Sequence, residues 1–104
     1  TGVQGAMKAS LSRLKGVKTA FLYGSYARGA EKEDSNINLL VIGQANITEL
    51  NDTVMGLEDK LKRDIDYLVF DELEYRKRKE SKDPFIGELL KGKKIFLVGR
   101  EDDV

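Results

Sequence analysis

Four short apolar runs, separated by segments of helical periodicity, restrict the folds open to this chain more than any other feature. The runs cover residues 18–23, 37–43, 64–70 and 94–98. The run over 37–43 is too short for a helix and rich in branched residues, which is typical of a central strand. We therefore expect four strands, joined by the segments between them.

Two of the intervening segments have the spacing of amphipathic helices. Apolar residues recur every three or four positions over residues 3–14, and Gly16 closes that segment. The same pattern runs over residues 47–61, where Asn46 followed by Glu49 suits a helix start. We expect one helix before the first strand and another after the second.

Two shorter helices are predicted after the third strand. Asp71 is placed to cap a basic helix over residues 72–81, and Asp83 precedes a proline that suits the first position of a helix ending near Gly92. The order is then helix, strand, strand, helix, strand, helix, helix, strand. Partial alternation of this kind predicts an α/β (mixed α+β) fold, with a single mixed sheet of about four strands covered by helices.

Composition excludes several classes of chemistry. The 104 residues are 40% hydrophobic, enough for one core, and we expect a single domain over residues 1–104. Without cysteine or histidine, the chain has no disulfide, thiolate nucleophile, imidazole base or His/Cys zinc site. Any metal must have oxygen ligands, which favours Mg²⁺, Mn²⁺ or Ca²⁺. Eighteen basic and eighteen acidic residues give no net charge, which argues against a wholly basic nucleic-acid-binding domain.

The chain has no membrane-spanning run and no signal-peptide pattern, so we expect a cytoplasmic protein with no membrane partner. It opens at Thr1 rather than at methionine. A processed chain, the remnant of a tag and a fragment of a longer protein are all consistent with that start.

A glycine turn directly follows the first predicted strand, with the sequence Gly-Ser-Tyr-Ala-Arg-Gly over residues 24–29. Gly24 allows a ligand to approach the backbone closely. If the next residues make a helical turn, their N–H groups favour an anion such as phosphate, with Ser25 adding a hydroxyl and Arg28 a guanidinium. An ordinary strand-to-helix turn is the alternative interpretation of the same residues.

Polar side chains stand at the heads of the next two strands. Side chains alternate along a strand, so Asn36 and Asn38 share one face, and so do Asp64 and Asp66. If the two strands are neighbours, Asn36, Asn38 and Asp66 converge near the glycine turn. The alternative is that these are ordinary polar residues at strand ends, facing water.

Together these segments resemble the nucleotidyltransferase superfamily of DNA polymerase β, in its minimal and mostly prokaryotic branch. The family pattern is Gly-Ser after a strand, Asp-x-Asp at the head of the next strand, and a third carboxylate one strand further on. The segment over residues 71–99 also resembles the form of this domain that follows an N-terminal winged helix in archaeal regulator-like proteins. The resemblance covers nearly the whole chain and implies the nucleotidyltransferase fold.

The resemblance also implies a role for each site residue. Gly24 and Ser25 would hold the triphosphate of ATP or another NTP, supported by Arg28. The positions of Asn36 and Asn38, with Asp66, would hold two Mg²⁺ ions, and Asp66 would help to activate an acceptor hydroxyl. The implied reaction transfers a nucleoside monophosphate to that hydroxyl and releases pyrophosphate.

Asn36 and Asn38 depart from the family pattern, because both stand where it has aspartate. Asn keeps the shape and one carbonyl oxygen but loses the charge, and Mg²⁺ prefers anionic oxygen ligands. Three explanations stay open: a naturally degenerate binding module, which we prefer; an enzyme of weak or altered activity; or an active enzyme disabled by substitution. Weakened metal binding at Asp66, Asn36 and Asn38 is expected in the first case.

The expected partners follow from these alternatives: a nucleotide, a protein partner or a fused N-terminal DNA-binding domain. A purely structural dimerisation domain, which predicts no nucleotide binding, is a third class. Residues 75–94 carry eight basic and three acidic residues, which suits nucleic acid or a phosphorylated partner, but a solvated helix face is the simpler interpretation. The acidic residues 101–103 are expected to form a plain solvated tail.

Overall fold

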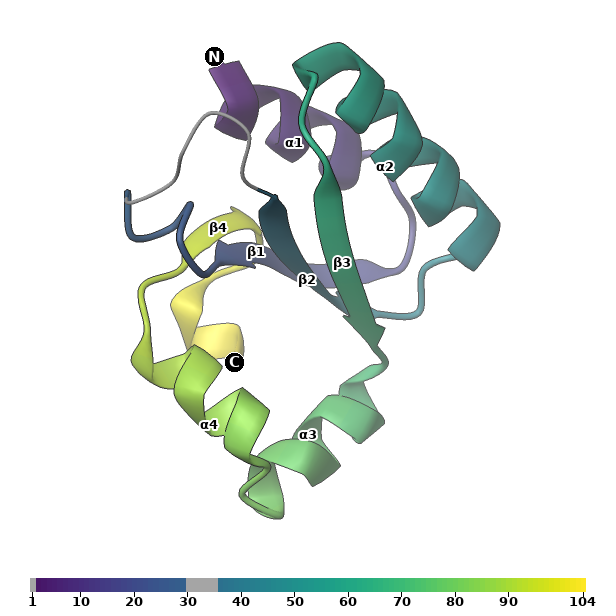
Figure 1. Cartoon of the computed structure of the whole chain (residues 1–104). Helices are drawn as coiled ribbons and strands as arrows, with labels where there is room; N and C mark the ends of the chain where they lie inside the picture. The colour runs from purple at the N-terminus through teal and green to yellow at the C-terminus, as the bar shows by residue number, and fades with distance from the viewer. Residues whose placement is uncertain (1, 30–35) are drawn as a thin grey trace.

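The computed structural model describes residues 2–29 and 36–104. A four-stranded sheet in the order β3-β2-β1-β4 forms its centre (Figure 1). The strands are β1 (Val17–Tyr23), β2 (Ile37–Gly43), β3 (Ile65–Phe70) and β4 (Ile95–Val98). β1 runs antiparallel to β2 and β4, whereas β2 and β3 are parallel. The predicted mixed sheet is therefore confirmed, with β3 and β4 at its edges.

Helices cover both faces of this sheet (Figure 1). They are α1 (Gly2–Ser12), α2 (Ile47–Leu61), α3 (Glu72–Glu80) and α4 (Pro84–Lys91), in the predicted order. α1 and α2 pack on one face, where Met7 and Leu50 are buried against Leu39 of β2. α3 and α4 pack on the other, where Tyr75 and Ile86 join a cluster that includes Leu40. The alternation of buried side chains along β2 thus supplies both cores.

The helix starts follow from local hydrogen bonds that the sequence already indicates. The Asn46 side chain accepts a hydrogen bond from the Glu49 N–H at 3.0 Å, and Asp71 accepts one from the Glu74 N–H at 2.7 Å. Asp83 accepts from two backbone N–H groups at the start of α4. These side chains satisfy donors that have no partner within the helix, so all three predicted caps are confirmed.

The C-terminal segment differs from the prediction of a plain solvated tail. Its acidic residues are exposed, but they form a 3-10 helix, η1 (Glu101–Asp103), in which Asp103 accepts a hydrogen bond from the Arg100 N–H at 2.8 Å. Lys94 forms an ion pair with Glu101 at 3.3 Å, and Val104 packs against the α3–α4 side of the core. The predicted exposure of these residues is confirmed, whereas the 3-10 turn was not predicted, and the contacts of Glu101 and Val104 depend on tertiary packing.

Residues 30–35, between the glycine turn and Asn36, lie outside the described residues. Within the described part of the chain, no helix has both the length and the apolar character needed to cross a lipid bilayer.

Candidate functional site

The register of the three central strands brings polar side chains together at one end of the sheet. Asn38 of β2 lies opposite Asp66 of β3 on one side and opposite Tyr23 of β1 on the other. The Ile37 N–H donates a hydrogen bond to the Asp64 carbonyl at 2.9 Å, so pairing between β2 and β3 begins at the strand heads. By alternation these residues face the same side of the sheet as α3 and α4.

Asn36 and Asp66 are joined directly. Asn36 lies just before β2, and its Nδ2 donates a hydrogen bond to Oδ2 of Asp66 at 2.8 Å. The amide group must present its NH₂ here, because its carbonyl oxygen would meet a carboxylate that only accepts. Both side chains are exposed, while Asn38 is half-buried. The structure thus brings together the two asparagines and Asp66, as the sequence predicts for neighbouring strands.

The glycine turn begins where Asn38 approaches the end of β1. Gly24 has a φ of +76°, which favours glycine, and a Cβ added there would lie 2.7 Å from Nδ2 of Asn38. The Arg28 N–H donates to the Gly24 carbonyl at 3.1 Å, which closes one helical turn over residues 24–28. The first N–H groups of such a turn have no partner within it, so they stay open to an anion.

Two aromatic residues next to the glycine turn were missed by the sequence analysis. Tyr23 and Phe85 of α4 meet edge to face, with ring centroids 6.0 Å apart at 80°. Both line a cavity of about 260 Å³ together with Gly24 and Arg28. The position of Tyr23 could have been found from the sequence, because Tyr23 directly precedes Gly24 at the end of a predicted strand. Nothing in the sequence indicates Phe85, since only tertiary packing brings α4 to this end of the sheet.

Electrostatics link Tyr23 to the polar cluster. Partial burial raises the pKa of the Tyr23 hydroxyl above its ordinary value, and the nearby negative charge of Asp66 raises this pKa further. Tyr23 therefore stays neutral at physiological pH and keeps its proton as a hydrogen-bond donor.

The residues present do not fit the pair of divalent ions that the family pattern implies. Among the described residues, no three carboxylates gather where they could hold a metal ion. Asp66 supplies the single negative charge of the cluster, and one of its oxygens accepts the Asn36 hydrogen bond. Divalent ions of the Mg²⁺ type require several oxygen ligands and prefer anionic ones. This donor set is better matched to a ligand that accepts hydrogen bonds.

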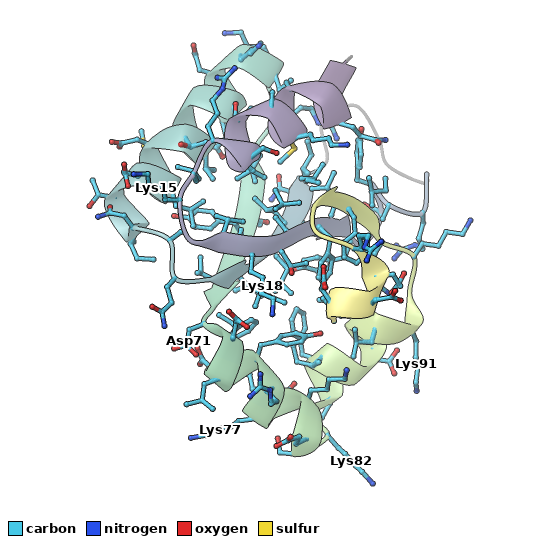
Figure 2. All side chains as sticks on the ribbon, turned by 180° about the vertical axis from the view of Figure 1, so that it is seen from behind. Lys15, Lys18, Asp71, Lys77, Lys82 and Lys91 are labelled. Atoms are coloured by element: carbon cyan, nitrogen blue, oxygen red, sulfur yellow. The ribbon has the colours of Figure 1, made fainter. Side chains whose placement is uncertain are left out.

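The predicted basic cluster is exposed along α3 and the turn after it. Figure 2 shows Lys77 and Lys82 extending away from the body of the protein. Arg78 is engaged instead: it forms ion pairs with Glu74 and Asp83, at 3.3 and 3.4 Å, and lies over the Phe70 ring. Lys93, from the same basic segment, lines the cavity at the glycine turn, whereas the basic residues of α3 do not.

A mixed sheet with helices on both faces and a Gly-Ser turn after its first strand defines a nucleotidyltransferase-type domain. The family model described as polymerase beta, nucleotidyltransferase, matches residues 6–100. The chain therefore belongs to the polymerase beta nucleotidyltransferase family. Comparison with curated proteins gives no significant match.

Solved structures share the fold at low sequence identity. A chain of a toxin–antitoxin complex with AMP-PNP aligns with a TM-score of 0.67 and 17% identity, over 96% of this chain and 76% of that one. A chain of the MntA–HepT toxin–antitoxin complex aligns with a TM-score of 0.58 and 16% identity, over 97% and 74%. The complex of tri-AMPylated Shewanella oneidensis HEPN toxin with MNT antitoxin gives 0.58 and 14%, over 97% and 73%. These similarities establish the fold.

Proposed function

We propose that this chain is a catalytically degenerate nucleotidyltransferase domain that binds a nucleotide and acts as a regulatory or interaction module. The observation that carries the proposal is the hydrogen bond from Asn36 Nδ2 to Asp66 Oδ2 at 2.8 Å. The family pattern has three carboxylates for two divalent ions. Here Asp66 is the one carboxylate that remains at these positions, and the Asn36 amide is hydrogen-bonded to it. Phosphoryl transfer depends on metal ions that neutralise charge. Loss of the metal ligands therefore abolishes the reaction, while nucleotide binding can persist.

Replacing carboxylates with amides also changes how a triphosphate is held. A carboxylate repels phosphate unless a metal ion lies between them, whereas the NH₂ group of Asn donates hydrogen bonds to phosphate oxygens. Asn38 lies within reach of the glycine turn, and Arg28 has no ion pair among the described residues. We infer that Gly24, Ser25, Asn38 and Arg28 hold the phosphates directly, with little need for Mg²⁺.

The adjoining cavity supplies a place for the nucleoside. Its volume is about 260 Å³, and the Phe85 ring is 43% exposed beside Tyr23. Exposed aromatic faces stack on nucleobases with little preference among them, since every base has a π-face. A nucleotide with its phosphates on the glycine turn and its base against Phe85 is the arrangement we propose.

Calorimetric titration of ATP, with and without Mg²⁺, tests this function. For the chain as it stands we expect the affinities under the two conditions to agree within about twofold. The double variant Asn36→Asp/Asn38→Asp restores three carboxylates and should gain at least about tenfold in affinity when Mg²⁺ is added, the scale on which metal sites respond to ligand changes. Pyrophosphate release from ATP should be absent in the unsubstituted chain.

A matched control keeps the change in charge but moves it away from the site. Asn46→Asp/Asn51→Asp adds the same two carboxylates on α2, where Asp can still cap the helix and accept the Tyr67 hydroxyl hydrogen bond. This control should bind ATP as the unsubstituted chain does. Identical responses of the two double variants would show that the asparagine pair is not at a metal site, and absence of any ATP binding would overturn the proposal.

The alternative function is an active Mg²⁺-dependent nucleotidyltransferase. Asp66 favours it, because this carboxylate is exposed at the head of β3, in register with Asn38. If the chain is active, pyrophosphate release with an acceptor hydroxyl should disappear in Asp66→Ala. Release that survives this substitution would place the activity elsewhere.

A protein partner is the second part of the proposal. Structural neighbours occur in toxin–antitoxin complexes, and this chain exposes Leu68 on the edge strand β3 and Leu73 on α3, at 41% and 57%. Two leucines beside an open strand edge suit an apolar segment of a second protein. A native complex isolated with this chain should dissociate with Leu73→Lys but not with Met55→Lys, which adds the same charge on α2. Equal retention by both variants would exclude this surface.

A further inference from the structure

The two edges of the sheet differ in how well they are protected against pairing with another strand. β4 has four residues, and its pairing with β1 shifts in register between Ala20 and Phe21. β3 has six residues and pairs with β2 in unbroken register. The β3 sequence contains neither lysine nor proline, the residues that commonly protect an edge strand. β3 is therefore the edge that is open to another strand.

The backbone groups of β3 alternate between β2 and this open edge. The Ile37 N–H of β2 donates a hydrogen bond to the carbonyl of Asp64 at 2.9 Å, which sets the pattern along the parallel pair. The even-numbered residues of β3 therefore direct their N–H and C=O groups toward β2. The odd-numbered residues Ile65, Tyr67 and Val69 direct theirs away from the sheet.

One of the outward donors is already engaged. The Ile65 N–H donates to the Glu58 carboxylate of α2 at 2.8 Å, which confirms that this group faces away from β2. The N–H groups of Tyr67 and Val69 have no hydrogen-bond partner among the described residues, because the sheet ends at β3 (Figure 1). These two donors, and the carbonyl groups beside them, are available to another strand.

We propose that β3 pairs antiparallel with β3 of a second copy of this chain, across a twofold axis that passes through Tyr67. In this register Tyr67 lies opposite Tyr67 of the second copy, and Ile65 lies opposite Val69. Each copy donates from Tyr67 to the Tyr67 carbonyl and from Val69 to the Ile65 carbonyl of the other, so both free donors gain acceptors. The inference rests on the interaction surface proposed above and identifies its partner.

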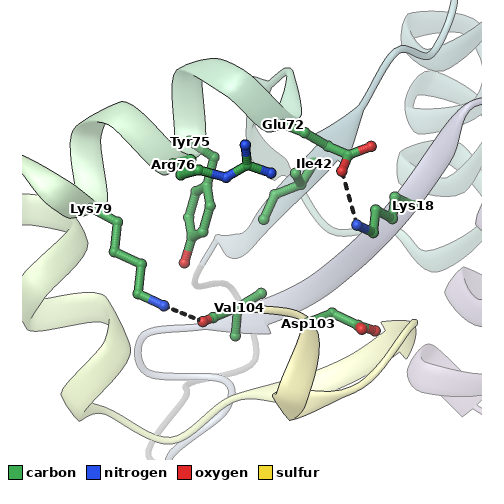
Figure 3. Close-up of a pocket in the computed structure, with 8 residues that line it drawn as sticks. All are labelled: Lys18, Ile42, Glu72, Tyr75, Arg76, Lys79, Asp103 and Val104. Atoms are coloured by element: carbon green, nitrogen blue, oxygen red, sulfur yellow. Dashed lines mark hydrogen bonds and ion pairs between the residues drawn. The ribbon is translucent and has the colours of Figure 1, made fainter.

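The charges at the two ends of β3 favour the antiparallel arrangement. Lys62 and Arg63 precede the strand, whereas Asp71 and Glu72 follow it. The proposed register places Arg63 opposite Asp71 of the second copy, so opposite charges meet at both ends of the interface. Glu72 contributes less, because it forms an ion pair with Lys18 at 2.8 Å (Figure 3). A parallel pair of the two strands would instead bring like charges side by side.

The side chains on the two faces of β3 fit the same register. On the α2 face, Tyr67 meets Tyr67 of the second copy as an aromatic pair. On the α3 face, Leu68 lies opposite Asp66 of the second copy and diagonal to its Leu68, within reach of a long side chain. Leu68 and Leu73, both exposed in a single copy, lie beside this edge. Pairing therefore removes apolar surface from water as well as satisfying backbone groups.

Sedimentation equilibrium of the full chain over a range of concentrations tests the association. We expect a reversible equilibrium between the monomer and a species of twice its mass. A chain that stays monomeric up to about 1 mM, the weak end of specific binding, would overturn this inference. That result would leave the surface beside Leu73 open to a different protein, so it is distinct from a failure of the proposed function.

Substitutions at Leu68 test the register as well as the surface. Leu68→Glu places a carboxylate opposite Asp66 of the second copy, twice across the axis, and should weaken association at least about tenfold. Leu68→Lys faces the same Asp66 with the opposite charge and should lose clearly less. Phe85→Glu adds a carboxylate to a side chain of similar exposure on α4 and should leave association unchanged.

Two outcomes of these substitutions would contradict the proposal. Equal losses in Leu68→Glu and Leu68→Lys would exclude the register centred on Tyr67. Equal losses in Leu68→Glu and Phe85→Glu would mean that added charge opposes association wherever it is placed, and that β3 is not the interface.

Hydrogen exchange followed by NMR detects the paired donors without any substitution. The Tyr67 and Val69 amides should exchange at least about tenfold more slowly in a concentrated sample than in a dilute one, because pairing covers them. The Leu68 amide, which faces β2, is the internal control and should change less. A dimer in which the Tyr67 and Val69 amides exchange equally fast at both concentrations would be assembled through another surface and would overturn the inference.

Discussion

At the scale of single residues, the site depends on how one charge acts on its neighbours. Asp66 holds the pKa of Tyr23 above the level that burial alone produces. Asp66→Asn should therefore lower the Tyr23 pKa, though not to its ordinary value, because the burial remains. The pH dependence of the Tyr23 ring-carbon NMR signals in the two proteins measures this. A Tyr23 curve that does not move in Asp66→Asn would contradict the geometry of the cluster.

Raised tyrosine pKa values also determine the direction in which the free energy of unfolding changes with pH. Tyr23 and Tyr75 both have raised pKa values in the folded state, so the stability they contribute is fully present below pH 10.0, the ordinary tyrosine pKa, and is lost as the pH rises through the folded-state values.

At this scale the sequence predicts which side chains share a face of a strand, but not which residues of distant elements they meet. Alternation along two strands suffices to place Asn36, Asn38 and Asp66 on one face, and their meeting follows once the strands are neighbours. The place of Phe85 beside Tyr23 and the burial of Tyr75 could not be predicted, because each depends on an element far away in the sequence.

At the scale of elements, the start of α4 is controlled by Asp83. Its side chain accepts hydrogen bonds from the N–H groups of Phe85 and Ile86, at 2.8 and 3.2 Å, and pairs with Arg78. Asp83→Ala should lower the free energy of unfolding by about 1–2 kcal/mol, the usual range for a lost cap. Asp83→Asn, which can still cap, should lose only a small part of this. Urea unfolding of both variants is the measurement, and equal losses would assign the effect to the Arg78 pair.

Helix starts and strands are predictable from the sequence because their signals are local. Asn46, Asp71 and Asp83 each lie within a few residues of the N–H groups they accept from, so short spacing carries the information. The turn of η1 also has a local contact, from the Arg100 N–H to Asp103 three residues on, but the pairing of Glu101 with Lys94 joins it to a distant residue. Acidic residues at a chain end otherwise indicate only solvation.

At the scale of the whole molecule, the two faces of the sheet are held unequally. Twelve of the described residues form the buried cluster under α1 and α2, whereas seven form the cluster under α3 and α4. α2 buries three side chains of its own, Leu50, Val54 and Leu57, but α3 buries only Tyr75. Burial of apolar area is the main stabilising contribution, so α3 has far less to lose on opening than α2.

We therefore expect α3 to open before the rest of the fold. Hydrogen exchange followed by mass spectrometry should show amides of α3 exchanging at least about tenfold faster than those in the middle of α2, and β1 and β2 exchanging slowest. Equal protection of the two helices would instead mean that the domain opens only as a whole, and that the larger core gives α2 no advantage.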